Sequence, residues 1–310
     1  MNLDAAAKPL GDVFGGRFVL VNYIPFYGAA LFLLVVIWAG APGELRFGRA
    51  WATAGKLGLG EVLLLTVALT VIGAATQPLQ LGLVRLVEGY WPRRLSWLGD
   101  RLRKRHEDRR DAMVEAAALP ERPEDLTQEE LNRIGIAGTT LTKHYPAEDA
   151  VRATAFGNAL AAAEAYAGAR FGWDAVVAWP RLYPMLGERV REIVDDRRDT
   201  MDFSVRLCAV SLATGIAGVV LLLDSGWWLC LALVPIAIGL LAYRSAVEAA
   251  MAYGEAIEAA FDLHRFDLLA ALHLPLPADQ EAERKLAAEL CTSWRQGAAS
   301  STSYDHQGPK

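Results

Sequence analysis

Residues 62–84 read VLLLTVALTVIGAATQPLQLGLV, a stretch of 23 residues without a charged side chain. Apolar residues surround the whole circumference of a helix with this sequence, so the segment offers no polar face to water. At ~1.5 Å per residue, such a helix is long enough to cross a hydrocarbon layer of about 30 Å. The stretch therefore predicts a membrane-spanning helix, and it does not fit the surface helix of a soluble core.

Three further runs, 18–43, 207–223 and 225–243, also lack charged side chains, and a polar stretch of 122 residues separates the two pairs. The sequence predicts an all-α integral membrane protein with four transmembrane helices, arranged as two hairpins, and a helical cytoplasmic domain. The predicted parts are a cytoplasmic N-terminus (1–17), a first transmembrane hairpin (18–84), a helical cytoplasmic insert (85–206), a second transmembrane hairpin (207–243), a cytoplasmic amphipathic helix (244–277) and a C-terminal segment with a disordered tail (278–310).

Basic residues near short loops indicate the orientation. The turn at 224–226 has no Lys or Arg and is followed by Trp227 and Trp228, which suit a membrane–water interface. Arg206 and Arg244 flank the inner ends of the third and fourth runs, and the segment after the second run is strongly basic. We therefore expect the insert and both termini to be cytoplasmic, although the first external loop also carries basic residues.

Composition and motifs argue against several function classes. A net charge of −5 disfavours nucleic acid as a partner, because phosphate binding needs a concentrated basic surface. Three cysteines and five scattered histidines give no disulfide framework and no metal-ligand spacing. No phosphate-binding loop, dinucleotide fingerprint or nucleophile elbow occurs, so we expect no cofactor and no metal, and we name no catalytic residue.

One local basic cluster follows the second apolar run. Its position favours contact with membrane lipid headgroups, and the alternative is a solvated helix face on the cytoplasmic side. The residues concerned are Arg93, Arg94, Arg101, Arg103, Lys104 and Arg105.

The amino-acid composition of the insert favours helices. Thr127 and Glu130 have the spacing of a capping box that opens a short helix. The predicted elements are helices over 93–118, 127–134, 147–168 and 187–206, the last leading into the third run, with a Gly-, Thr- and Pro-containing loop over 135–146.

Beyond the fourth run, a helix is predicted from 244 to 272, where Pro275 and Pro277 stop it. Glu248, Glu255 and Asp262 recur every seven residues and form an acidic stripe. The opposite, small and apolar face predicts close packing, either against the insert or against a neighbouring subunit.

Polar groups inside the apolar runs are candidates for function, because burying them in lipid is costly. Asn22 in the first run and Gln77 and Gln80 in the second lie toward the same inner third of a hairpin. They predict either hydrogen bonds between helices or the lining of a pore. Glu61, at the outer end of the second run, is a further candidate, for which interfacial solvation near Lys56 is the simpler explanation.

An aromatic segment at 171–184, FGWDAVVAWPRLYP, is the other candidate. Rings of this kind anchor a fold or an interface, and a small-molecule pocket is the alternative. We interpret it as an interaction segment formed by Trp173, Asp174, Trp179, Arg181 and Tyr183.

Two stretches, ATAFGNALAAAEAYAGARFGWDAVVAWPRLYPML (153–186) and AYGEAIEAAFDLHRFDLLAALHLPLP (252–277), resemble a family of uncharacterised multi-pass bacterial membrane proteins, mainly from actinobacteria. Where this chain has Thr154 to Asn158, a Thr-Arg-Phe-Gly-Asn stretch is usual in that family, so a basic group is missing here. The resemblance implies a bacterial inner-membrane location and no particular activity. In layout alone, the two hairpins with cytoplasmic extensions are also similar to bestrophin-type anion channels.

Three functional hypotheses follow. The first is a non-enzymatic protein of the bacterial cytoplasmic membrane that assembles with itself or with a cytosolic partner through its helical cytoplasmic domain. The second is an oligomeric ion channel or pore lined by Asn22, Gln77 and Gln80. The third is a membrane enzyme with a cytoplasmic site near Asp174 and Arg181.

Overall fold

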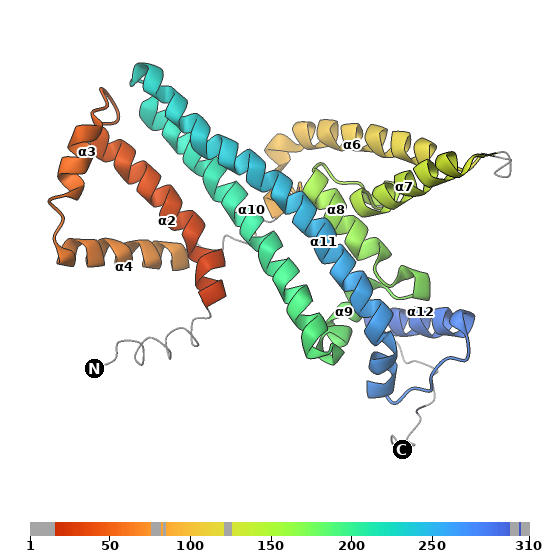
Figure 1. Ribbon diagram of the computed structural model, residues 1–310. Coiled ribbons are helices and arrows are strands. Elements are labelled where there is room, and N and C mark those ends of the chain that lie inside the picture. The colour runs from red at the N-terminus through yellow and green to blue at the C-terminus, as the bar shows by residue number, and fades with distance from the viewer. Residues whose placement is uncertain (1–15, 76–81, 83–84, 121–125, 298–303, 305–310) are drawn as a thin grey trace, which may run out of the picture. The chain divides into compact units, whose positions relative to one another are not determined.

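The computed structural model describes residues 16–75, 82, 85–120, 126–297 and 304, with side chains from Ile24 onward. Every regular element among these residues is a helix, so the predicted all-α class is confirmed (Figure 1). The chain divides into two compact units: the first comprises Met1–Val87 and Asp199–Ala246, and the second comprises Glu88–Arg198 and Val247–Lys310. Apart from Gln296, Gly297 and Tyr304, the tail predicted to be disordered lies outside the described residues.

The first unit contains the apolar runs. Its elements are α2 (Gly16–Ala39), α3 (Phe47–Ala54), α4 (Leu59–Ala75), η6 (Gly226–Ala232) and parts of two long helices, α10 (Glu188–Leu222) and α11 (Leu233–Ala271). The predicted helices at 187–206 and 244–272 are therefore confirmed as uninterrupted extensions of the third and fourth runs.

Within the first unit, α10 and α11 approach each other through small residues. A Cβ atom built on Gly215 would lie 2.5 Å from Ile236, and one on Gly239 would lie 2.8 Å from Leu212. The hydroxyls of Ser204 and Ser245 are 3.1 Å apart. Small residues and hydroxyl pairs at a helix contact are typical of packing in membranes, where apolar burial between helices gives little driving force.

Among the residues that the structure describes, two helices are long and apolar enough to cross a membrane: 188–222, and the continuous helical stretch from Gly226 to Ala271. A third is added if α3 and α4, which meet at a bend of 106°, count as one broken span. This number is lower than the four predicted. Parts of the first and second apolar runs lie outside the residues whose side chains are described, and the first run contributes only the shorter apolar segment Ile24–Ala39.

Two loops of the first unit lie together. The Ser225 hydroxyl, in the turn between α10 and η6, donates a hydrogen bond of 2.7 Å to the carbonyl of Gly43, and the rings of Phe47 and Trp228 meet edge to face at 5.1 Å. The loop after α2 and the turn after α10 are thus at the same end of this unit. The sequence predicts that both loops are external, and that orientation stays a prediction.

The second unit contains most of the insert and the chain beyond Ala246. Its core surrounds Phe261, Leu182 and Leu269, which are fully buried. Its elements, besides the ends of α10 and α11, are η1 (Arg93–Leu95), α6 (Ser96–Ala117), α7 (Gln128–His144), η3 (Glu148–Ala150), α8 (Ala155–Tyr166), η4 (Ala169–Phe171), α9 (Ala175–Leu182), η5 (Tyr183–Met185) and α12 (Gln280–Gln296). Helices α6 and α7 lie side by side as a hairpin (Figure 1).

The capping box of Thr127 and Glu130 is confirmed, with reciprocal bonds between their side chains and backbone N–H groups. The predicted loop over 135–146 is wrong, because α7 continues to His144. Threonine hydroxyls in this stretch donate to carbonyls three or four residues earlier, which satisfies them without interrupting the helix. Contact with α6 along its length supplies the packing that weak helix formers need.

Two further expectations are corrected. The helix predicted over 147–168 begins only at Ala155, after the Thr154 hydroxyl accepts the Gly157 N–H as an N-cap. The helix α12 was not predicted at all. Its signal in the sequence is Asp279, which caps the Ala282 N–H at 2.8 Å, followed by Glu281 and Glu283 in the first turn.

Candidate functional site

The aromatic segment predicted to mediate interactions is largely engaged inside the second unit. Trp173 is buried and stacks on Trp294 of α12, with ring centroids 6.1 Å apart, and the Arg181 guanidinium lies 4.4 Å from the same Trp294 ring. Trp179 contacts Phe261 of α11, and the Tyr183 hydroxyl donates to Asp195 of α10 at 2.8 Å. These contacts make the segment an anchor of the fold.

Asp174 caps α9 by accepting the Val177 N–H at 3.1 Å, and its other oxygen pairs with Arg295 of α12. Its own N–H donates to the Cys291 sulfur at 3.4 Å. Burial raises the pKa of the Cys291 thiol, which disfavours the reactive thiolate. Asp174 and Arg181 thus hold α12 against the aromatic segment. The sequence analysis could not assign this role because it did not predict α12.

The acidic stripe of α11 is also partly engaged within the unit. Glu255 pairs with Lys143 of α7 at 2.5 Å, and Asp262 pairs with Arg170 of η4 at 2.6 Å. Of the two alternatives left by the sequence, packing against the insert is therefore observed for this part of α11.

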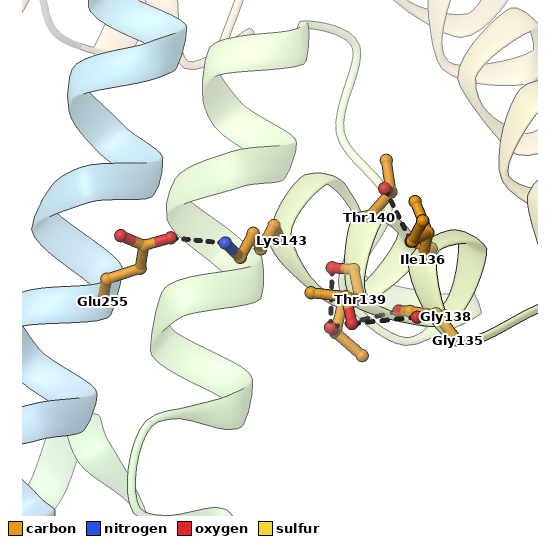
Figure 2. A network of polar contacts seen from close by, with 8 residues as sticks. Gly135, Ile136, Gly138, Thr139, Thr140, Lys143 and Glu255 are labelled. Atoms are coloured by element: carbon orange, nitrogen blue, oxygen red, sulfur yellow. Dashed lines mark hydrogen bonds and ion pairs between the residues drawn. The ribbon is translucent and has the colours of Figure 1, made fainter. Parts of the chain in front are cut away.

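A groove of about 290 Å³ lies between α7, α8 and α11, and the Lys143–Glu255 pair is part of its wall (Figure 2). Its lining is dominated by small side chains and threonine. A Cβ atom on Gly254 would lie only 2.7 Å from Ala163, which shows how closely α11 and α8 approach beside the groove. Its lining includes Thr139, Thr142, Lys143, Glu255 and Glu258.

The hydroxyls of the two threonines that line this groove are already satisfied. Thr139 donates to the Gly135 carbonyl at 2.9 Å (Figure 2). Thr142 donates to the Gly138 and Thr139 carbonyls, so the methyl groups of both threonines are left for contact. The hydrogen bond and charge of Glu255 raise the pKa of the Lys143 ammonium. The groove therefore combines methyl-covered walls with a charged rim.

A second set of close contacts involves Thr154–Asn158, the stretch in which this chain departs from the family that it resembles. Asn158 is fully buried, accepts the Arg152 N–H at 2.6 Å and donates to the Arg152 carbonyl at 3.0 Å. A Cβ atom on Gly157 would lie 2.2 Å from the Glu88 carbonyl oxygen, so only glycine permits this approach. The stretch therefore positions Arg152 against the chain that follows the second apolar run.

The predicted lipid-contact residues lie on η1 and α6, and all six are exposed: Arg93, Arg94, Arg101, Arg103, Lys104 and Arg105. Neither α6 nor α7 has a buried residue. Arg103 donates to Glu107 at 3.2 Å on the same helix. The placement leaves the cluster accessible, as lipid contact requires.

The predicted pore residues are mostly beyond what the structure describes. Gln77 and Gln80 lie outside the described residues, and Asn22 lies in α2 but its side chain is not described. Glu61 is in the first turn of α4, where its carboxylate accepts the Gly58 N–H at 2.8 Å. Glu61 therefore caps a helix start, which favours the interfacial explanation of this residue.

No protein-family model matches the chain, and comparisons with curated proteins and with solved structures return no match. The family resemblance noted from the sequence accordingly stays an expectation.

Proposed function

We propose that the protein is a non-enzymatic integral protein of a bacterial cytoplasmic membrane that assembles with itself or with a cytosolic partner through its helical cytoplasmic domain. In this proposal α10 and α11 are two of four spans, the other two come from the apolar runs at 18–43 and 62–84, and both termini are cytoplasmic. The presence of two helices long and apolar enough to cross a membrane supports the membrane part of the proposal.

The groove between α7, α8 and α11 is the observation that supports assembly. A proton-transfer site needs a group whose pKa lies near neutrality, whereas Glu255 moves the pKa of Lys143 further upward, so the ammonium persists at neutral pH. The hydroxyls of Thr139 and Thr142 donate to their own helix and expose methyl groups. Such a surface is suited to receiving a side chain of another protein and poorly suited to chemistry.

The rim of the groove indicates the chemistry of that partner. Glu255 is paired with Lys143, and Glu258 also lines the groove. The three side chains carry one excess negative charge. A helix that inserts an apolar side chain and places Lys or Arg beside Glu258 would complement both the methyl-covered walls and this charge.

Filling the groove tests the proposal. Thr139→Leu and Thr142→Leu add volume on exposed positions that line the groove, whereas Thr140→Leu changes the same residue type outside its lining. We expect the detergent-solubilised native protein and Thr140→Leu to show the mass of an oligomer or to co-purify with a second protein. The groove variants should lose that association. A monomer without a partner, or a Thr139→Leu variant that assembles normally, would contradict the proposal.

The channel alternative depends on the first unit, where a crevice of about 320 Å³ lies between α2, α10 and α11. Its lining is mainly apolar, and the Thr214 hydroxyl, one of its few polar groups, donates to the Val210 carbonyl at 2.7 Å. Such a lining fits a lipid tail better than a hydrated ion. The channel stays a prediction, which ion flux in liposomes and its loss in Gln77→Leu would test.

A further inference from the structure

A cavity of about 510 Å³ in the second unit lies between residues 89–91, the first turns of α6 and residues 149–153. Its charged lining consists of two cationic and two anionic side chains, Arg103, Arg152, Asp100 and Asp149. The lining also contains small residues, including Gly89, Gly99 and Ala153, whose side chains take up little of the cavity's volume. A ligand that carries one negative and one positive charge matches this balance.

Arg152 is positioned for an anion by its backbone, which the buried Asn158 side chain holds with two hydrogen bonds. The guanidinium lies 5.1 Å from the Tyr90 ring centroid and contacts Glu88 at 3.5 Å and Glu164 at 3.3 Å. These contacts use one donor on each terminal nitrogen, and a guanidinium has five N–H donors. The guanidinium therefore keeps capacity for a phosphate, whose geometry arginine matches well.

The segment 90–97, which contributes Tyr90, Trp91 and Ser96 to the cavity lining, has the composition of a membrane–water interface. The side chains of Tyr90, Leu95 and Trp97 are 56%, 44% and 64% exposed. Arg93 and Arg94, which lie between them in the sequence, are also exposed. The segment begins within six residues of the end of the apolar run at 62–84. Exposed tryptophan, tyrosine and arginine directly after such a run are typical of the headgroup level of a bilayer, which identifies the source of the ligand as lipid.

We propose that this cavity binds the headgroup of a phospholipid that carries a phosphodiester and a primary ammonium, as in phosphatidylethanolamine. Arg103 and Arg152 bind the phosphate, and Asp100 and Asp149 accept hydrogen bonds from the ammonium. Trp97 and Leu95 contact the glycerol and the first methylenes of the lipid. This site is separate from the groove between α7, α8 and α11 and does not depend on the proposed assembly, but its assignment to lipid rests on the proposed membrane span at 62–84.

Native mass spectrometry of the full-length protein tests the proposal, with lipids of one headgroup offered at equal concentration: phosphatidylethanolamine, phosphatidylglycerol or phosphatidylcholine. We expect phosphatidylethanolamine to be retained in preference to both others, because only its headgroup offers a phosphate together with N–H donors. Equal retention of the three lipids, or preferential retention of phosphatidylglycerol, would overturn the proposal. Soluble glycerophosphoethanolamine separates the two sources of the headgroup, and binding as tight as that of the lipid would overturn the lipid assignment.

Matched variants locate the site. Arg103→Gln and Asp149→Asn change exposed residues of the cavity, so the fold should persist, and each should lower phosphatidylethanolamine retention roughly three- to tenfold. Arg133→Gln in α7 and Asp108→Asn in α6 remove the same charges from exposed positions outside the lining and outside the basic cluster, and they should leave retention unchanged. An equal loss in the control variants would show that bulk charge, and not the cavity, retains the lipid, which would refute the assignment.

Discussion

Gly157→Ala is the substitution for which the structure gives the clearest quantitative expectation. The added Cβ atom would lie 2.2 Å from the Glu88 carbonyl oxygen, so the two segments must separate by at least 0.8 Å to reach the 3.0 Å below which real contacts of this kind are essentially never found. The Thr154 hydroxyl, 2.9 Å from the same position, blocks a second direction of relief. The obstacle is backbone, which cannot rotate away as a side chain would.

The expected change in the free energy of unfolding is the sum of two opposing effects. Overpacking of this kind costs about 3 kcal/mol, and replacing glycine by alanine inside a helix returns about 1 kcal/mol, which leaves a net loss of about 2 kcal/mol. Gly135→Ala in α7 is the matched control, because nothing lies within 4 Å of its added Cβ, so only the gain of about 1 kcal/mol remains. The two variants should therefore differ by about 3 kcal/mol.

Thermal unfolding of the full-length protein in one detergent, followed by tryptophan fluorescence, measures this difference. We expect Gly157→Ala to unfold roughly 4–6 °C below Gly135→Ala. The scans must share one heating rate, because unfolding of a membrane protein is commonly irreversible. Hydrogen exchange in the first turn of α8 should also accelerate in Gly157→Ala alone. If Gly157→Ala unfolds at or above the temperature of the control, the close approach of Glu88 and the reasoning based on it are wrong.

Three other predictions concern the second unit. Glu283→Ala leaves the partly buried Arg265 guanidinium without its carboxylate partner at 2.7 Å and should destabilise the protein by about 3 kcal/mol in denaturant titration, whereas the apolar double variant Arg265→Met/Glu283→Leu should recover most of the loss. Burial and two nearby arginines lower the pKa of His106 below its ordinary 6.5. Because the unfolded chain then binds a proton more readily than the folded chain, the stability of the protein should fall as the pH drops below about 6.5. The fall should be shallower in His106→Gln. A Cβ atom on Gly254 would lie 2.7 Å from an alanine of α8, so Gly254→Ala should lower stability by about 1 kcal/mol in the same titration, and a gain would contradict the close packing of α8 and α11.

Much of the helical architecture could be predicted from local patterns. The third and fourth apolar runs, their helical extensions and the capping box of Thr127 and Glu130 all depend on residues within a few turns of one another. Prediction failed where local signals conflicted with packing. Gly135 and the threonines after it favour a loop by propensity, but contact with α6 and hydroxyl bonds to the helix carbonyls keep α7 helical to His144.

The candidate sites show the same division. The aromatic segment was recognisable as an anchor, but its anchoring partner, α12, was not predicted, so Asp174 and Arg181 could not be assigned to Trp294 and Arg295. The basic cluster after the second run was recognisable from charge alone. The cavity that combines Arg103 with Arg152 was not, because 49 positions separate the two residues.

The sequence by itself determined that the chain is helical and that it contains apolar segments fit for a membrane, because periodicity, length and charge are properties of neighbouring residues. The tertiary structure alone decided that Lys143 meets Glu255, that Arg152 meets Glu88, and that α12 covers the aromatic segment. Each of these contacts joins different secondary-structure elements or loops. Their proximity depends on how the helices pack in three dimensions, and no local repeat in the sequence encodes it.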